Sequence, residues 1–315
     1  ASGERLPGRK IEGNEYFVNP LNFREFINKL VDKKDKIKNP DIRRIASKIK
    51  KFDGFSPLDP DIEGIVPFFD ELDSLFYSYI LTGGFPEVIS DYLKKGKIDE
   101  KMYETVIRLV LGTLSKEGKS EEIGREIMEK ILNSRASRLD FVTIASDIGI
   151  HHNTVRDYVE LLESSRIIYW LPAWDINKKR YSLGKQKKAI FQSSLIPQAL
   201  YYYITGCAYD DILDFVDRNL EVIVEQLVPS HVIWSFEKPV IRERHAFAGF
   251  YYNTKECDLL ILKDKTFYGY EVKYGKLEKK RYPITVSYIT KDTMDENAYP
   301  ASLFLAGIEK SERVI

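Results

Sequence analysis

Residue types that carry specialised chemistry are scarce in this sequence. Its 315 residues include two cysteines and four histidines, which are Cys207, Cys257, His151, His152, His231 and His245. The cysteines form no C-x-x-C pair, so neither a disulfide scaffold nor a thiol redox motif is indicated. A zinc site would lack ligands, and we therefore expect no structural metal. A reducing, cytoplasmic environment fits this composition best.

Long apolar runs and a net charge are also missing. No stretch approaches the ~18 apolar residues that a membrane span requires, and the N-terminal residues lack the apolar region of a secretory signal. We therefore expect no membrane partner. The 48 basic residues balance 48 acidic residues, so the molecule as a whole does not attract nucleic acid. DNA binding would have to come from a local basic patch.

The length of the chain exceeds that of one typical core, so we expect several domains. Composition and periodicity divide it into residues 1–30, 31–134, 135–200 and 201–315. The first segment predicts a strand at Tyr16–Val18 and then a helix, with Asn22 as N-cap and Glu25 at the capping-box position. Within residues 31–134, the part up to 56 is strongly charged, prolines mark a loop before 68, and helices are predicted at 68–81 and from about 86 to 133. The predicted fold class is therefore a multidomain α/β (α+β) protein: a helical bundle, a winged helix-turn-helix and an α/β domain with a central mixed sheet.

Residues 138–191 predict a winged helix. Two apolar-periodic segments, Phe141–Ile148 and 151–165, meet at a turn containing Gly149, and strands are expected at 167–171 and 188–191. The loop between those strands is basic, with Lys178, Lys179, Arg180, Lys185, Lys187 and Lys188. We predict that Lys178, Lys179 and Arg180 contact DNA together with Asn153, Thr154 and Arg156 of the second helix. Because Asp157, Glu160 and Glu163 share that helix, a protein-packing role is the alternative.

The C-terminal segment predicts a helix followed by a sheet. The helix is expected at 211–227, the strands at 230–236, 246–253, 259–263, 266–272 and 285–290, and a last helix at 300–309. Alternate strand residues share a face, so Glu271 and Lys273 project together, and Asp258 approaches them if its strand is the neighbour. Asp258 and Glu271 would then bind Mg²⁺, and Lys273 would position or deprotonate a water. The alternative is an ordinary hairpin with a solvated Glu271–Lys273 pair.

This order of elements resembles the PD-(D/E)XK nuclease superfamily, in which a helix carrying an acid precedes a sheet carrying D…ExK. The resemblance implies that Glu225 is the helix acid. The predicted catalytic set is therefore Glu225, Asp258, Glu271 and Lys273, which we expect to converge at one edge of the sheet in a cleft facing solvent. Catalysis does not follow from the fold, because such folds are also kept for binding.

A wider resemblance covers essentially the whole chain. The motifs that carry it are LPGR at 6–9, PLNFREF at 20–26, TGGFPE at 82–87, EVKYG at 271–275 and YPASLFL at 299–305. Together they resemble a family of archaeal and bacterial AAA+ ATPases, with Gln192-Ser193-Ser194 where the family often has Asp-x-Gly. The resemblance implies a helical lid at 31–134, in which Gly83, Gly84 and Pro86 face an adenine. The other reading of that element is a turn that ends one helix and starts the next.

No G-x-x-x-x-G-K-[ST] motif is present, so this chain cannot cradle ATP phosphates by itself. In the family, LPGR follows the ATPase core, so ATP and that core are expected only in a parent protein, with the core as a partner. Two functions remain open. The first is a DNA-binding winged helix coupled to a Mg²⁺-dependent nuclease-like domain; the alternative is a non-catalytic interaction or regulatory module. An oligomer is compatible with either.

Overall fold

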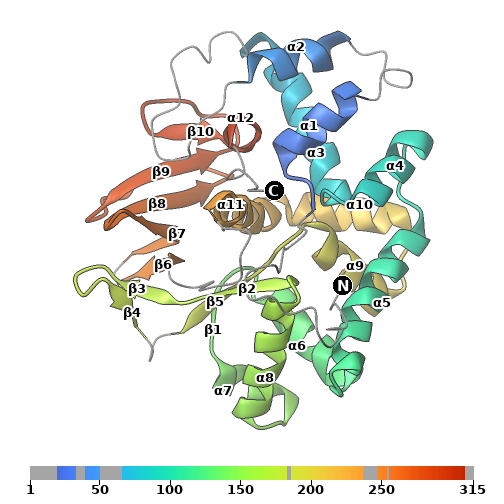
Figure 1. Cartoon of the computed structure of the whole chain (residues 1–315), viewed down its shortest axis with the longest axis vertical. Helices are drawn as coiled ribbons and strands as arrows, with labels where there is room; N and C mark the ends of the chain where they lie inside the picture. Colours follow the sequence, from blue (N-terminus) through green and yellow to red (C-terminus); the bar gives the residue numbers. More distant parts are fainter. Residues whose placement is uncertain are drawn as a thin grey trace, which may run out of the picture.

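The computed structural model describes residues 20–32, 40–49, 66–182, 186–236, 247–253 and 255–308. The predicted strand at Tyr16–Val18, the LPGR motif and Lys185 lie outside these residues. Figure 1 shows the described part of the chain as helices on one side, a large sheet on the other, and a smaller helix-and-sheet unit against both.

The N-terminal half is helical, as predicted. Its α-helices are α1 (Phe23–Asp32), α2 (Pro40–Lys48), α3 (Phe69–Thr82), α4 (Pro86–Lys95), α5 (Glu100–Lys116) and α6 (Glu121–Asn133), with a short 3-10 turn at Val66–Phe68. The predicted capping box of α1 is confirmed. The Glu25 N–H donates to Asn22 Oδ1 at 2.7 Å, and the Asn22 N–H donates to the Glu25 carboxylate at 2.9 Å.

The predicted helices on either side of Gly149 and the predicted strands after them are present. Helix α7 (Phe141–Ile148) ends at Gly149, whose φ of +80° is left-handed, and α8 (His152–Ser164) follows. Strands β1 (Arg138–Leu139), β2 (Ile168–Leu171) and β5 (Lys187–Phe191) form a three-stranded antiparallel sheet in the order β1-β5-β2. We call residues 138–171 and 187–191 the winged-helix unit.

The basic segment expected as a loop between β2 and β5 is not a single loop. It contains strands β3 (Ala173–Asp175) and β4 (Arg180–Tyr181), which belong to the larger sheet, where β3 pairs in parallel with β6 (Ala248–Tyr252). The chain crosses from one sheet to the other at Pro172 because Ala173 and Trp174 are apolar side chains that become buried there. The hairpin β3–β4 is thus part of the C-terminal sheet.

The larger sheet is mixed, as the predicted fold class requires. Its strands β7 (Glu256–Lys263), β8 (Thr266–Lys273), β9 (Thr285–Thr290) and β10 (Ala298–Pro300) continue from β6, in the order β10-β9-β8-β7-β6-β3-β4. Strands β6, β7 and β8 run antiparallel, whereas β8, β9 and β10 run parallel. Helix α12 (Ala301–Gly307) follows directly.

One expected strand is wrong. Residues 195–236 form three helices, which are α9 (Leu195–Thr205), α10 (Tyr209–Arg218) and α11 (Leu220–Phe236). The predicted helix at 211–227 is therefore interrupted at Asn219, and the predicted strand at 230–236 is the second half of α11. This half reads as a strand because it is apolar and contains Pro229, but it is buried on every side and so needs no helical periodicity.

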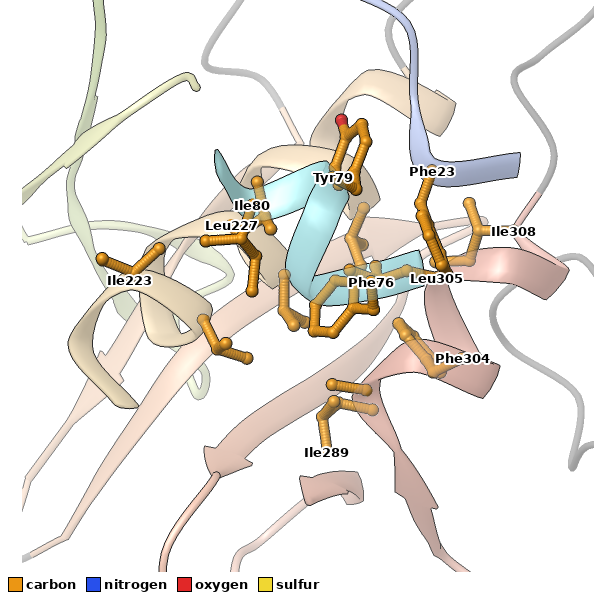
Figure 2. Close-up of a cluster of buried hydrophobic side chains, with 14 of the residues drawn as sticks. Phe23, Phe76, Tyr79, Ile80, Ile223, Leu227, Ile289, Phe304, Leu305 and Ile308 are labelled. Atoms are coloured by element: carbon orange, nitrogen blue, oxygen red, sulfur yellow. The ribbon is translucent and has the colours of Figure 1, made fainter. Parts of the chain in front are cut away.

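One hydrophobic core joins the helices to the larger sheet. Figure 2 shows Phe23 of α1 and Phe76 of α3 beside Leu227 of α11, Ile289 of β9 and Phe304 of α12. The predicted segments 1–30, 31–134 and 201–315 therefore share a core. None of the described helices is both long and apolar enough to span a bilayer.

Candidate acidic site between the two sheets

The structure brings the four predicted catalytic residues together. Strands β7 and β8 are antiparallel neighbours with Leu259 opposite Tyr270, so Asp258 lies beside the segment that carries Glu271. Asp258 Oδ2 accepts the Val272 N–H at 2.9 Å. On the same side of β8, Lys273 Nζ lies 2.8 Å from Glu271 Oε1, as strand alternation predicted. Glu225 approaches Asp258 from α11.

The centre of the site is a residue that sequence reasoning did not place there. Lys188 Nζ lies 2.9 Å from Asp258 Oδ1, 2.8 Å from Glu256 Oε1 and 3.4 Å from Glu225 Oε1. The Lys188 side chain is 2% exposed. It comes from β5 of the winged-helix unit, so the ion pairs join the two sheets.

Strand alternation explains why Lys188 points at the larger sheet. On β5, Ala189 and Phe191 belong to the core beneath α7 and α8, whereas Ile190 belongs to the core shared with α11. Lys188 is on the Ile190 side. The signal in the sequence is a lysine followed by the apolar strand residues Ala189, Ile190 and Phe191, whereas the prediction places Lys188 with the basic loop.

We call the whole set the acid–lysine cluster. It comprises Glu225, Glu256, Asp258 and Glu271 with Lys188, Lys273, Lys280 and Arg138. Lys280 Nζ lies 3.4 Å from Glu271 Oε1, and Arg138 Nε lies 3.1 Å from Glu256 Oε2. Four acidic side chains thus face four basic side chains, so their formal charges balance.

The cluster does not face solvent in a cleft, contrary to expectation. Asp258 is 6% exposed and Glu271 is 1% exposed. The physical reason is position in the sheet: β7 and β8 are interior strands, and β5 with α11 covers this part of them. Only Glu225, Glu256 and the rim cations keep partial exposure.

Burial and charge shift the pKa values of the acids in opposite directions. Burial raises the pKa of Asp258, but the Lys188 ammonium outweighs this effect, with help from Lys273 and the Val272 N–H, so the net pKa lies below its ordinary value. Glu225 is the opposite case, because burial and the Asp258 charge raise its pKa to about 8. Burial and Asp258 likewise raise the pKa of Glu271 against the opposing Lys273.

The lysines remain protonated. Burial lowers the pKa of Lys273, but the hydrogen bond to Glu271 and the charge of Asp258 outweigh that effect and raise it. A lysine that deprotonates a water needs a lowered pKa. Lys273 is therefore not set up for the base role suggested for it, and Lys188, whose pKa is also raised by its carboxylates against its burial, is not either.

The arrangement does not fit a divalent cation. Both oxygens of Asp258 are engaged, one by Lys188 and one by the Val272 N–H, and Glu271 Oε1 is engaged by Lys273. The second oxygen of Glu271, Oε2, is buried and has no hydrogen-bond partner among the described residues. Over that same part of the chain, no group of three or more His, Cys, Asp or Glu side chains is arranged to hold a metal ion. A cation at Asp258 would have to replace the Lys188 ammonium.

The predicted adenine-facing residues are mostly buried. Gly83 and Gly84 end α3 inside the fold, and only Pro86 at the start of α4 is exposed. Gly83 O accepts the Ser193 hydroxyl at 2.9 Å, and a Cβ on Gly84 would lie 2.3 Å from Leu21 O. The geometry supports the reading of this element as a turn, because the two glycines present no surface to a nucleotide.

The predicted DNA-contacting residues fall into two separate groups. Asn153 and Arg156 are exposed on α8, and Thr154 is half-buried beside them. Lys178, Lys179 and Arg180 instead lie at the turn of the β3–β4 hairpin, on the edge of the larger sheet. They therefore do not form a wing of the three-stranded sheet. Lys179 Nζ donates to Lys265 O at 3.1 Å, which ties this turn to the β7–β8 turn.

Besides the residues at the hairpin turn, two basic side chains lie together near the start of α7. The Phe141 ring stacks on Trp170, with centroids 5.0 Å apart and planes 6° apart. Arg156 and Lys187 approach the Phe141 ring, at 5.7 Å and 5.8 Å from its centroid. Burial and the nearby Arg156 charge lower the pKa of Lys187. Two cations held close together favour a bound anion.

Comparisons with known proteins reach only part of this architecture. The model of a family described as a domain of unknown function, DUF8612, matches residues 73–200. The match runs from α3 into α9 and includes the winged-helix unit and the β3–β4 hairpin. No curated protein and no solved structure matches the chain significantly.

Proposed function

We propose that this chain is a non-catalytic interaction module, in which a winged helix and a nuclease-like sheet act as one rigid unit. The Lys188 ammonium carries the proposal, because it occupies the centre of the acid set. A metal-dependent nuclease needs carboxylates that are open to the cation and to the phosphodiester. Here the winged-helix unit closes them, and the cluster needs no further charge.

The connection between the two sheets supports a rigid unit. Strands β2 and β5 have one face on the helix-turn-helix and the other on the core with α11. The chain between them forms two strands of the other sheet. From the resemblance to archaeal ATPases, the partner to test is an ATPase core, and ATP would bind there rather than at Gly83 and Gly84.

We expect the chain to show no nuclease activity with Mg²⁺ or Mn²⁺. The test incubates the purified chain with single-stranded, duplex and branched DNA over a range of Mn²⁺ concentrations. Asp258→Asn is the matched control, because it keeps the shape of the side chain and removes its charge. Cleavage by the unaltered chain that disappears in Asp258→Asn would show that the site is catalytic and would overturn the proposal.

A second candidate function is DNA binding by the winged-helix unit. The observation that favours it is the pair Arg156 and Lys187 beside Phe141, next to the exposed Asn153. The acidic residues of α8 would repel the phosphates of DNA, but this repulsion is reduced because Asp157 is paired with Lys119 at 3.2 Å. Phosphate contacts by the two cations would release counterions and give salt-dependent affinity.

The double variant Arg156→Ala/Lys187→Ala is expected to weaken any DNA binding and to lower the slope of log K against log salt by about two units. The matched control is Lys178→Ala/Lys179→Ala/Arg180→Ala, which removes three cations from the hairpin turn and should leave the slope unchanged. Fluorescence anisotropy at several salt concentrations measures both. A salt slope that falls only in the triple variant would place the DNA at the hairpin turn. If the unaltered chain binds no DNA, a protein remains the candidate partner.

A further inference from the structure

We infer that two adjoining hairpin turns of the larger sheet form a docking surface for an acidic segment of a partner protein. We call this surface the basic ridge. It comprises five exposed side chains, which are Lys178, Lys179 and Arg180 of the β3–β4 turn and Lys263 and Lys265 of the β7–β8 turn. The inference rests on the proposed function, because it names the surface and the partner chemistry of the interaction module.

The two turns are held together although they are far apart in the sequence. Lys179 Nζ donates to Lys265 O at 3.1 Å across 86 positions. Beneath the turns, the Trp174 ring packs on those of Tyr181 and Phe267, which belong to the two different hairpins. In Figure 1 the β3–β4 turn lies at the left edge of the molecule, away from α8. The ridge is therefore a fixed surface, separate from the winged-helix residues that were predicted to contact DNA.

The backbone of both turns is unfavourable for the residues that occupy it. Six described residues other than glycine have a left-handed φ, and three of them are in these turns: Lys179 at +48°, Asp264 at +48° and Lys265 at +64°. A Cβ is crowded in that conformation. Lys263 pairs with Thr266, so Asp264 and Lys265 form a two-residue hairpin turn, in which glycine is preferred at the second position.

Lysine thus stands at two left-handed positions where glycine would relax the backbone. The contact of Lys179 with the Lys265 oxygen needs the side chain of only one of them. Backbone strain that the local fold does not require is typical of functional surfaces. The strain therefore points to a role for the two lysine side chains in binding.

The charge of the ridge selects an anionic partner. Residues 175–180 and 263–266 contain the five basic side chains of the ridge and two acidic ones, Asp175 and Asp264. Lys178 Nζ is 3.8 Å from Asp175 Oδ2, and the Lys178 side chain is 63% exposed. The excess of basic side chains attracts carboxylates or phosphates.

Carboxylates of a protein fit this surface better than the phosphates of DNA. Asp175 and Asp264 stand among the cations, where they would repel a continuous row of phosphates but leave room for carboxylates at separate positions. Four of the five cations are lysines, which lack the planar fork with which arginine binds phosphate. The net charge of the whole chain is zero, so long-range attraction does not favour a polyanion either.

The test is binding of a fluorescein-labelled peptide of alternating glutamate and alanine to the full chain, measured by fluorescence anisotropy at low and high salt. A peptide of alternating glutamine and alanine shows the binding that does not depend on charge. We expect saturable binding of the glutamate peptide that weakens with salt. Lys179→Gly/Lys265→Gly should bind it at least about tenfold more weakly.

The matched control is Arg135→Gly/Arg166→Gly, which removes two cations from left-handed positions outside the ridge. It should leave the affinity for the glutamate peptide unchanged. Lys179→Arg/Lys265→Arg keeps both charges and should retain the binding of the unaltered chain.

The melting temperature separates binding from folding. Glycine relaxes a left-handed backbone, so Lys179→Gly/Lys265→Gly should melt at the same temperature as the unaltered chain or higher, while it loses affinity for the peptide. A lower melting temperature would assign the two lysines to the fold and would overturn the inference.

The remaining outcomes also decide. The inference is wrong if the unaltered chain does not bind the glutamate peptide, or if the ridge variant and the control variant bind it equally well. Duplex DNA that binds the unaltered chain and loses affinity in Lys179→Gly/Lys265→Gly would make the ridge a nucleic-acid surface instead. Mn²⁺-dependent DNA cleavage by the unaltered chain would refute the proposed function and leave the peptide result standing, so the two failures are distinguishable.

Discussion

A Gly84→Ala variant is expected to lose about 3 kcal/mol or more of its free energy of unfolding. Gly84 has φ +77°, and a Cβ there would lie 2.3 Å from Leu21 O and 3.1 Å from the Tyr79 hydroxyl. The Leu21 oxygen is a backbone atom that accepts the Tyr79 hydroxyl at 2.7 Å, and Leu21 N donates to Gly84 O at 2.9 Å. The contact cannot relax without separating α1 from α3.

Gly96→Ala is the matched control for this variant. Gly96 also ends a helix in the left-handed region, with φ +71°, but no described atom lies within 4 Å of its Cβ position. Its cost should be the backbone strain alone, about 1 kcal/mol. Urea unfolding followed by tryptophan fluorescence compares the two variants. Equal losses would mean that the close approach of Leu21 to Gly84 contributes nothing.

Trp174→Ala is expected to lose about 3 to 5 kcal/mol. Trp174 is 4% exposed, and its ring lies 4.3 Å from that of Tyr181 and 5.2 Å from that of Phe267, centroid to centroid. It is the largest side chain that β3 contributes to the sheet, and Gly249 gives it room, because a Cβ there would lie 2.5 Å from its ring. Its removal would leave a cavity in the apolar cluster that Trp174 forms with side chains of β7, β8 and β9, such as Leu260, Phe267 and Val286.

Tyr203→Ala provides the control, since Tyr203 is aromatic but 47% exposed. Its loss should stay within about 0.5 kcal/mol. Denaturant unfolding gives the two free energies, and limited proteolysis of the hairpin shows whether β3–β4 detaches. The interpretation fails if Trp174→Ala costs no more than Tyr203→Ala, or if the hairpin detaches while the rest of the chain keeps its stability.

Local signals allowed much of the fold to be predicted. The Asn22–Glu25 capping box, the Gly149 turn and the alternation in β8 depend on neighbouring residues alone, and all three are found. The helices of the N-terminal half and the mixed sheet follow from hydrophobic periodicity. The pattern D…ExK predicted that Asp258, Glu271 and Lys273 lie together because it needs only two neighbouring strands.

The remaining features depend on contacts between distant residues. Whether the basic loop forms a wing or an edge of the larger sheet depends on β6, which no local pattern connects to Trp174. Lys188 meets Asp258 across 70 positions in the sequence, so only the assembled fold shows that it neutralises the cluster. The second half of α11 was misread because a helix buried on every side shows no polar face.

The crossing of the chain between the two sheets has a consequence for synthesis on the ribosome. The winged-helix unit emerges complete, but its inserted hairpin β3–β4 finds its parallel neighbour only after β6 has been made. Until then Trp174 and Ala173 are apolar side chains without their final partners, and the Lys188 ammonium has no Asp258 to neutralise. Pairings between distant residues form late and slowly. The nascent chain is therefore expected to depend on chaperones during this interval, and ribosome-bound chains halted before β6 should be cut by protease at the hairpin first.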